Sequence, residues 1–266
     1  MISYISLMKK IMFEGQNSNG TLSLFGETLD FDLRNGFPLV TTRKINYKAA
    51  FGELSCFLNG YTDVRSFKAQ GVNFWDDDCY KEKWANNPNK RHEYDLGKIY
   101  GYQWTEGFGF NQIHKLIQNL KDNPSSRRHV LITYNPADLA EMCLPPCYVS
   151  HQFYVEGKFL NMLVHQRSAD FCLGVPFDIA SFAAFQSLIA REVGLVPKTL
   201  KIIFGDVHIY KEHFEGVKIQ IRRKPLDLPA LVFDAHTNIR KFSAHNVDAY
   251  IYNYHDPIKY PFVVQS

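Results

Sequence analysis

The chain has 266 residues, of which 45% are hydrophobic and 15% aromatic, and its formal net charge is +3. This length suits one large domain or two small ones, and the apolar fraction is high enough for a sizeable core, which argues against a disordered protein. The charge is too small for the basic surface typical of a nucleic-acid-binding protein, although it is compatible with a small phosphate-bearing substrate.

The N-terminal part of the chain predicts two helices and a hairpin. Apolar residues at helical spacing over 5–12 predict a first helix, which Gly15 ends. Lysines interrupt this apolar pattern, unlike the uninterrupted run of a signal peptide. Residues 21–32 (TLSLFGETLDFD) alternate as a β-hairpin does, and a second helix over 51–58 is stopped by Asn59-Gly60.

The central part begins with a polar, charged stretch, 76–95, which we expect to be a surface loop or insertion. An amphipathic helix follows over 113–120, and a strand is expected over 129–134. Residues 152–166 then read as a second hairpin, with its turn at Glu156-Gly157.

The C-terminal part predicts a mostly buried helix over 182–193, ended by Gly194, and a strand over 200–210 with a bend at Gly205. Strands and helices mix without a regular βαβ alternation, which predicts an α+β fold. No repeat or linker divides the chain, so we expect one domain over 1–266, with 76–95 as its insertion. No run of about 18 apolar residues predicts a membrane span.

The cysteines are odd in number and form no CxxC pair, which disfavours a disulfide framework: Cys56, Cys79, Cys143, Cys147 and Cys172. We therefore expect reduced thiols and a cytoplasmic location, in the host cytoplasm if the protein is viral.

Cys147 follows two prolines and precedes an apolar strand. A buried structural cysteine is the commoner fate of such a residue, and a thiolate nucleophile is the functional alternative, which requires a nearby cation. His151 shares its strand face but is about 13 Å away at four residues along a strand, so the sequence does not support a Cys-His protease pair.

Other polar residues stand at the ends of expected elements. Arg127-Arg128 and Arg167-Ser168 resemble a phosphate clamp, although single surface arginines are usually only solvated. Glu53 lies at the edge of an apolar helix face, as a rim carboxylate or as a partly buried acid suited to proton relay.

Asp170 and Asp178 flank FCLGVPF, but no third ligand has metal-like spacing, so we expect no metal. His208 and Tyr210 share a strand face, as ligands of a sugar hydroxyl or as hydrogen-bonded core groups.

Eight blocks then occur in the order found in one family: NGFPLVTTRK, GELSCFLNG, IYGYQW, PSSRRHVLITYN, LPPC, QRSADFCLGVPFDIASF, GDVHIY and HDPIKYP. Across nearly its whole length the chain resembles thymidylate synthases and their pyrimidine-hydroxymethylase relatives. The resemblance implies a large mixed sheet flanked by helices, an obligate homodimer packed sheet to sheet, and 5,10-methylenetetrahydrofolate as one-carbon donor.

The resemblance also implies roles for single residues. Cys147 matches the nucleophile that adds to C6 of the pyrimidine, and Glu53 and Tyr100 match a proton-relay pair. The remaining matches fall into three groups: substrate ligands of the same subunit (Gln166, Arg167, Ser168, Asp170, Asp178, His208 and Tyr210), phosphate ligands that reach across the dimer (Arg127 and Arg128), and folate-site residues (Trp75, Asp170, Leu173 and Gly174).

One departure from the family pattern concerns the base. Thymidylate synthases have asparagine at the position of Asp178, whereas deoxycytidylate hydroxymethylases have aspartate. A protonated Asp178 can donate to N3 of cytosine while its other oxygen accepts from the 4-amino group, which contributes ~1–3 kcal/mol of discrimination. Tyr148 replaces the usual histidine after the nucleophile, which also argues against a site adapted to uracil.

The other departures concern the folate and the phosphate. Asn46 replaces a histidine, and Asp78 replaces a second tryptophan for which Trp84 could compensate; both changes favour a wetter site. The sequence 16–20 (QNSNG) lacks the usual phosphate-binding arginine, and the tail YPFVVQS is longer than usual. Trp75, which shields the intermediate in the methylating enzymes, is retained.

These observations predict folate-dependent hydroxymethylation of dCMP at C5, with dCMP favoured over CMP. The alternatives are methylation of dCMP by hydride transfer and, less favoured, thymidylate synthesis from dUMP. A catalytically silent nucleic-acid-binding protein on the same scaffold is opposed by Cys147, Glu53 and the arginines.

Overall fold

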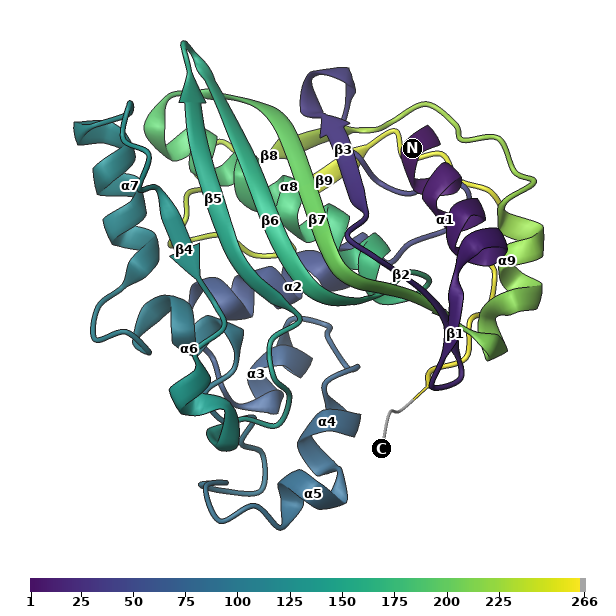
Figure 1. Cartoon of the computed structure of the whole chain (residues 1–266). Helices are drawn as coiled ribbons and strands as arrows, with labels where there is room; N and C mark the ends of the chain where they lie inside the picture. Colours follow the sequence, from purple (N-terminus) through teal and green to yellow (C-terminus); the bar gives the residue numbers. More distant parts are fainter. Residues whose placement is uncertain (264–266) are drawn as a thin grey trace.

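A computed structural model describes residues 1–263 of the chain (Figure 1). Its centre is a seven-stranded sheet in the order β1-β2-β7-β6-β5-β4, with β3 also paired to β7. Strands β6 and β7 are parallel and the other neighbours are antiparallel, so the sheet is mixed. The predicted α+β class with a large mixed sheet is therefore confirmed.

The hairpin predicted over 152–166 is confirmed as β5 (Tyr148–Glu156) and β6 (Phe159–Asp170). Gly157 supplies the positive φ of 58° that the turn requires. Next to β6 runs the long, curved β7 (Val196–Tyr210), and at Gly205 the backbones of the two strands approach closely. A Cβ there would stand 2.7 Å from the Arg167 carbonyl oxygen, so glycine permits this pairing.

The hairpin predicted over 21–32 is wrong in its pairing. Strands β2 (Thr21–Phe25) and β3 (Thr28–Asp32) do not pair with each other but follow one another along β7. The Gly26 N–H donates to the Gly205 carbonyl, and the Phe204 N–H donates to the Glu27 carbonyl, so the ladder continues through the expected turn. β2 instead forms its hairpin with β1 (Gln16–Ser18).

One face of the sheet is covered by α8 (Gly174–Val193) and, behind it, α2 (Tyr47–Leu58). Alternate residues of the strands point toward these helices and are buried, among them Val164 on β6 and Ile202 on β7. Gly194 ends α8 in the left-handed conformation, as predicted. The opposite face of β5, β6 and β7 carries no helix among the described residues (Figure 1) and exposes side chains such as Tyr154, which is 60% exposed.

The segment 76–95 is folded rather than a polar loop. It contains α4 (Asp76–Tyr80) and α5 (Glu82–Ala85), and it buries Cys79 and Trp84. The Trp84 indole N–H donates to the Asp95 carbonyl over 2.6 Å. Because few apolar side chains anchor it, the segment shows no hydrophobic periodicity in the sequence.

The other elements complete the layer around the sheet. The predicted helices over 5–12 and 113–120 are confirmed as α1 (Ile2–Glu14) and α7 (Gln112–Asp122), and the strand over 129–134 as β4 (Val130–Ile132). The remaining elements are α3 (Val64–Ala69), α6 (Tyr100–Thr105), α9 (Phe214–Gln220), the hairpin β8 (Ala230–Phe233) and β9 (Val247–Tyr250), and three short 3₁₀ helices, Leu33–Asn35, Pro136–Glu141 and Lys211–His213.

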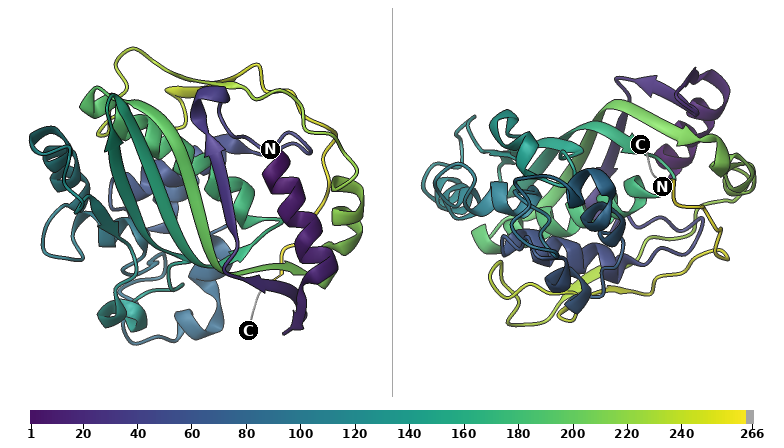
Figure 2. Two further views of the ribbon diagram at one scale, coloured as in Figure 1. Left: turned by 45° about the horizontal axis from the view of Figure 1, so that its top comes forward. Right: turned by 90° about the horizontal axis from the view of Figure 1, so that it is seen from below.

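The C-terminal tail runs along the side of the molecule on which α1 and α9 lie together (Figure 2). The predicted tail YPFVVQS lies partly outside the described residues, which end at 263. Among the described helices, none is long and apolar enough to cross a membrane.

Candidate active site

The candidate residues gather at one corner of the sheet. Cys147 immediately precedes β5, whose first residue, Tyr148, pairs with Gln166 near the end of β6. In the parallel pair of β6 and β7, Asp170 lies beside His208. Helix α8 begins four residues after Asp170 and carries Asp178 in its second turn. Helix α2 lies behind the sheet, and α4 and α6 lie toward its lower end (Figure 1).

Cys147 is held by its backbone in a rigid setting. Its N–H donates to the Tyr100 hydroxyl over 2.8 Å, and its carbonyl accepts from the Arg167 N–H over 2.8 Å. The Arg167 guanidinium donates to the carbonyls of the two preceding prolines over 2.8 and 3.0 Å. The Arg167 cation is close enough to lower the pKa of the Cys147 thiol, as activation of a nucleophile requires.

The surroundings of the Cys147 sulfur have opposing effects on the pKa of its thiol. Burial raises the pKa of the thiol, whereas the Tyr100 hydrogen bond and the Arg167 charge lower it. Burial thus favours the neutral thiol, and ionisation depends on the Arg167 charge and on the Tyr100 hydroxyl.

Glu53 projects from α2 into the same corner. Its carboxylate accepts from the Trp75 indole N–H over 2.6 Å. Burial raises the pKa of Glu53 to about 8, the Trp75 hydrogen bond opposes this shift, and the Asp178 carboxylate adds to it. The structure therefore favours the interpretation of Glu53 as a partly buried acid over that of a rim carboxylate. A pKa of about 8 suits proton transfer at neutral pH.

Asp178 faces the site from the first turns of α8. One of its oxygens accepts from the Gln166 amide over 2.7 Å, and the other has no hydrogen bond to any described residue. Burial raises the pKa of Asp178 to about 7, the Gln166 hydrogen bond opposes the shift, and Asp170 adds to it. The Gln166 Oε1 atom is buried without a partner in the described chain, so this pair has hydrogen-bonding capacity left for a ligand.

The end of β7 forms the next wall of the site. His208 Nδ1 is 2.6 Å from Asp206, which also accepts from the Ser23 hydroxyl over 2.8 Å. Asp206 thus fixes the ring of His208, and Tyr210 packs edge-on against that ring at 5.2 Å. Asp206 was not among the predicted residues, although a signal for it exists, because residues two apart on a strand share one face.

Asp170 shapes the entry to α8. One of its oxygens accepts from the backbone N–H groups of Cys172 and Leu173 over 2.9 and 3.1 Å. A Cβ on Gly174 would lie 3.8 Å from Asp178, so Gly174 is in the same neighbourhood. Ser168 lies opposite Asp206 in the register of β6 and β7. The structure therefore brings all the predicted same-subunit residues to one corner.

A family model described as thymidylate synthase matches residues 2–264 of the chain. The chain belongs to the thymidylate synthase family. It is 37% identical to the thymidylate synthase of Mycoplasma genitalium, over 96% of this chain and 97% of the relative. It is also 36% identical to the bifunctional dihydrofolate reductase-thymidylate synthase of Paramecium tetraurelia, over 96% of this chain and 60% of the relative.

Family membership makes the protein a folate-dependent one-carbon transferase acting on pyrimidine nucleotides. It confirms the resemblance at the level of the family and of methylenetetrahydrofolate as co-substrate. The choice of base and of product depends on residues particular to this chain.

Tyr148 is one such residue, and it lies in the floor of this thymidylate synthase family site. Its ring is 4.6 Å from that of Tyr100, and both are buried. Burial raises the pKa of Tyr148 well above its usual value, and the charges of Glu53 and Asp178 act in the same direction. Its hydroxyl is therefore a neutral donor close to both carboxyl groups.

His151 lies behind Tyr148 rather than beside Cys147. A register shift in β5 between Tyr148 and Ser150 helps to turn both rings toward the core, where they lie 5.2 Å apart. Neither ring nitrogen of His151 has a partner among the described residues, and burial lowers its pKa to about 3. A neutral, enclosed imidazole cannot activate the thiol, in agreement with the rejection of a protease pair.

Arg127 and Arg128 are the predicted site residues that the structure places elsewhere. Both are outside the core and form no ion pair with any described residue. The His129 carbonyl accepts from the Phe153 N–H, so the arginines lie six or more residues along the sheet from Cys147, which is about 20 Å. An arginine side chain cannot span this distance to a nucleotide bound in its own subunit.

The structure also shows the surroundings of Asp78 and Asn46, two residues that depart from the family pattern. Asp78 forms an ion pair of 2.8 Å with Lys81, and the side chains are 23% and 27% exposed. Trp84 does not take the place of the missing tryptophan, since its indole is buried against Asp95; that expectation is wrong. Asn46 is exposed at the start of α2.

Proposed function

We propose that this protein transfers a hydroxymethyl group to C5 of dCMP, with 5,10-methylenetetrahydrofolate as the one-carbon donor. The observation that carries the proposal is Asp178, half-buried at the site with one oxygen bonded to Gln166 and the other available to a base. A raised pKa of about 7 keeps much of this carboxyl protonated near neutral pH, which is the form that complements cytosine.

The nucleophilic step belongs to Cys147. Its thiolate adds to C6 of the pyrimidine, and the electron pair of the C5–C6 double bond moves toward C5 and N3. The free oxygen of a protonated Asp178 donates to N3, and the oxygen that accepts from Gln166 also accepts from the 4-amino group. Uracil would instead present N3–H and O4, and an ionised Asp178 would face O4 with no donor between them.

Proton transfer belongs to Glu53, with Tyr100 close to the sulfur. The folate supplies a methylene group that C5 attacks, and tetrahydrofolate leaves once C5 has lost its proton. Glu53, with its pKa of about 8, is placed to move protons in these steps. Water then adds to the exocyclic methylene, Cys147 leaves C6, and one proton returns to solvent.

We assign the phosphate and the deoxyribose of the nucleotide to side chains at the ends of β6 and β7. We assign Arg167 and Ser168 to the phosphate, because a guanidinium matches phosphate oxygens. We assign His208 and Tyr210 to the deoxyribose hydroxyl, because Asp206 holds the His208 ring in one orientation. The residues that border the space assigned to the folate are Trp75, Asp170, Leu173 and Gly174.

The decisive experiment is to weigh the product. The protein is incubated with methylenetetrahydrofolate and either dCMP or dUMP, and nucleotide masses are measured. We expect hydroxymethyl-dCMP together with tetrahydrofolate. A methylated dCMP with dihydrofolate would assign a dCMP methyltransferase, and turnover of dUMP alone would refute the choice of cytosine.

Asp78 and Lys81 offer a test of the choice between water and hydride. Their charges act on the Cys143 thiol, so the pair borders the loop that leads to Cys147. A half-buried ion pair keeps water nearby, whereas tryptophan excludes it. We expect Asp78→Trp to shift part of the product from hydroxymethyl to methyl. Asp77→Trp, on the exposed neighbour, serves as the control; equal product ratios in both variants would contradict this role.

We also propose a homodimer that packs through the bare sheet face, with Arg127 and Arg128 completing the partner's phosphate site. The length of β5 between Cys147 and these arginines excludes action within one subunit. An Arg127→Ala/Arg128→Ala double variant and a Cys147→Ala variant should each be inactive alone.

Mixing these two variants tests the arrangement across subunits. After dissociation and reassociation, we expect up to about a quarter of wild-type activity, because a mixed dimer carries one intact site. Mixed dimers with no recovered activity would show that the arginines do not serve the partner's site.

A further inference from the structure

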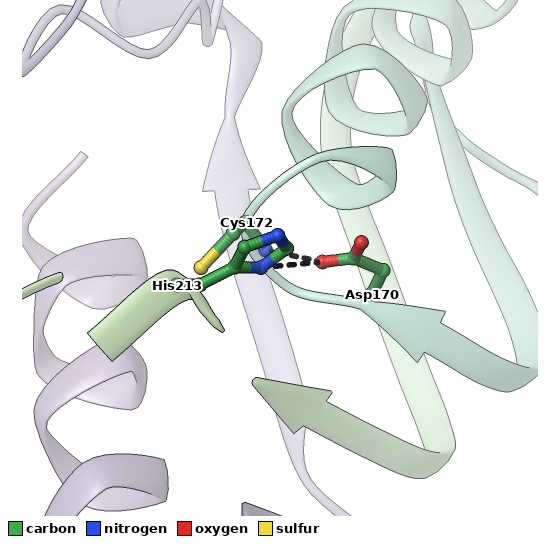
Figure 3. A group of neighbouring side chains, drawn as sticks. All are labelled: Asp170, Cys172 and His213. Atoms are coloured by element: carbon green, nitrogen blue, oxygen red, sulfur yellow. Dashed lines mark hydrogen bonds and ion pairs between the residues drawn. The ribbon is translucent and has the colours of Figure 1, made fainter. Parts of the chain in front are cut away.

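Three potential metal ligands meet where β6, α8 and the segment after β7 come together. Asp170, Cys172 and His213 each offer one ligand atom, and these atoms lie within 4.8 Å of one another. Figure 3 shows the His213 imidazole facing the Asp170 carboxylate, with the Cys172 sulfur beside the ring. Because His213 comes from a distant part of the sequence, the spacing of Asp170 and Asp178 could not reveal the cluster.

The hydrogen bonds of His213 define which nitrogen is free. Nε2 lies 2.8 Å from the Pro261 carbonyl oxygen, which can only accept, so Nε2 carries the proton in the neutral ring. Nδ1 then bears a lone pair. The His213 side chain is fully buried, and its Nδ1 has no hydrogen-bond partner in the described chain. Nδ1 lies 3.9 Å from Asp170 Oδ1.

This arrangement sets two acceptor atoms, His213 Nδ1 and Asp170 Oδ1, against each other. Oδ1 accepts from the backbone N–H groups of Cys172 and Leu173, whereas Nδ1 has no donor among the described residues. A cation would remove the conflict, and the donors are a carboxylate, a thiol and an imidazole, which suit zinc. A backbone carbonyl that holds the second nitrogen is also the usual outer partner of a metal-bound histidine. The Asp170 side chain is 22% exposed, which gives an ion access from solvent.

We propose that Asp170, Cys172 and His213 form a Zn²⁺ site. The bonds would run to one Asp170 oxygen, Cys172 Sγ and His213 Nδ1, with water in the fourth position, and the thiol proton would pass to solvent. Bond lengths of about 2.0–2.3 Å require the three atoms to close in by about 1 Å, which side-chain rotation can supply. The ionised carboxylate and thiolate balance the charge of the ion.

The site has a consequence for catalysis that rests on the proposed folate role of Asp170. A zinc ion on Asp170 engages the carboxylate and occupies space next to Leu173 and Gly174. Zinc is therefore an inhibitor that competes with the folate, rather than a participant in the reaction.

Metal binding is tested without turnover, by titrating the protein with Co²⁺ in place of Zn²⁺. We expect the wild type and Cys147→Ala to develop thiolate-to-cobalt charge-transfer absorption at one ion per chain, which Zn²⁺ abolishes. Cys172→Ala is expected to lose this absorption, and His213→Gln to bind at least about 10-fold more weakly. Circular dichroism and thermal unfolding establish that the variants are folded.

The proposal is overturned if the folded wild type shows no such absorption, or if the absorption survives in Cys172→Ala. Its loss in Cys147→Ala alone would assign the metal to the nucleophile instead. Inhibition by Zn²⁺ that is not relieved by excess folate would refute the competition while leaving the binding result intact. None of these outcomes depends on which base or product the protein prefers, so failure of the proposed function is detected separately.

Discussion

Cys147→Ser is expected to abolish turnover, lowering kcat by at least about 10⁴-fold. Pyrimidine C5 is a poor nucleophile until a thiolate has added to C6, and a serine hydroxyl is far less ionised than a thiol at neutral pH. The side chains are nearly equal in size. The backbone N–H of residue 147 donates to the Tyr100 hydroxyl and its carbonyl accepts from the Arg167 N–H, so the pocket should persist. Steady-state kinetics with dCMP, together with equilibrium binding of dCMP, measure the two effects separately.

The control for this variant is Cys143→Ser, in the same loop. Cys143 is buried, and burial raises the pKa of its thiol well above the ordinary value. We expect it to retain most activity, with a loss of stability of ~1 kcal/mol from the buried hydroxyl. Substantial turnover by a Cys147→Ser protein that binds dCMP normally would remove covalent catalysis from the proposal.

The sequence predicts most of the scaffold because its signals are local. Helix α8 shows a long apolar pattern that ends at Gly194, and the β5–β6 hairpin shows alternation around Gly157. The partner of β2 could not be predicted in this way, since alternation reports which face is buried and not which strand lies alongside. The fold of 76–95 was missed for a related reason, because its anchors Cys79 and Trp84 are isolated among polar residues.

The candidate site likewise contains residues that local motifs predict and contacts that depend on the three-dimensional fold. Cys147, Arg167 and Asp178 stand in motifs whose order identifies the family, so their meeting at one corner was predictable. The contact of His213 with Asp170 was not, because it depends on how the segment after β7 folds against the distant end of β6. The Gln166 Oε1 atom beside Asp178, which has no partner among residues 1–263, is likewise visible only in three dimensions.

Asp178→Asn is expected to move the ratio of kcat/KM for dCMP to that for dUMP by about 5–150-fold toward dUMP, corresponding to ~1–3 kcal/mol. An amide presents both a donor and an acceptor and so matches N3–H and O4 of uracil, while the proton that Asp178 gives to N3 is lost. Parallel assays with the two nucleotides measure the ratio. Gln166→Glu is a poor control because it alters the same pair, whereas Asp170→Asn changes a neighbouring carboxyl and should weaken both substrates alike. An unchanged ratio in Asp178→Asn would rule out base recognition by this residue.

The same substitution, Asp178→Asn, is also expected to change stability: it should stabilise the fold although it weakens cytosine recognition. Burial raises the pKa of Asp178 to about 7 from its ordinary value of 3.8. Between pH 3.8 and 7 the folded state holds a proton that the unfolded state has released, so the free energy of unfolding falls as the pH rises. Above pH 7 both states are ionised, and the whole cost of burying the charged carboxylate destabilises the fold. The amide of Asp178→Asn carries no such charge, so the variant should be more stable than the wild type by ~1–3 kcal/mol at pH 8 and about equally stable at pH 4. Denaturant unfolding at the two pH values measures this difference. A gain in stability together with the loss of cytosine preference would show that the buried carboxyl is kept for recognition, at a cost to the fold.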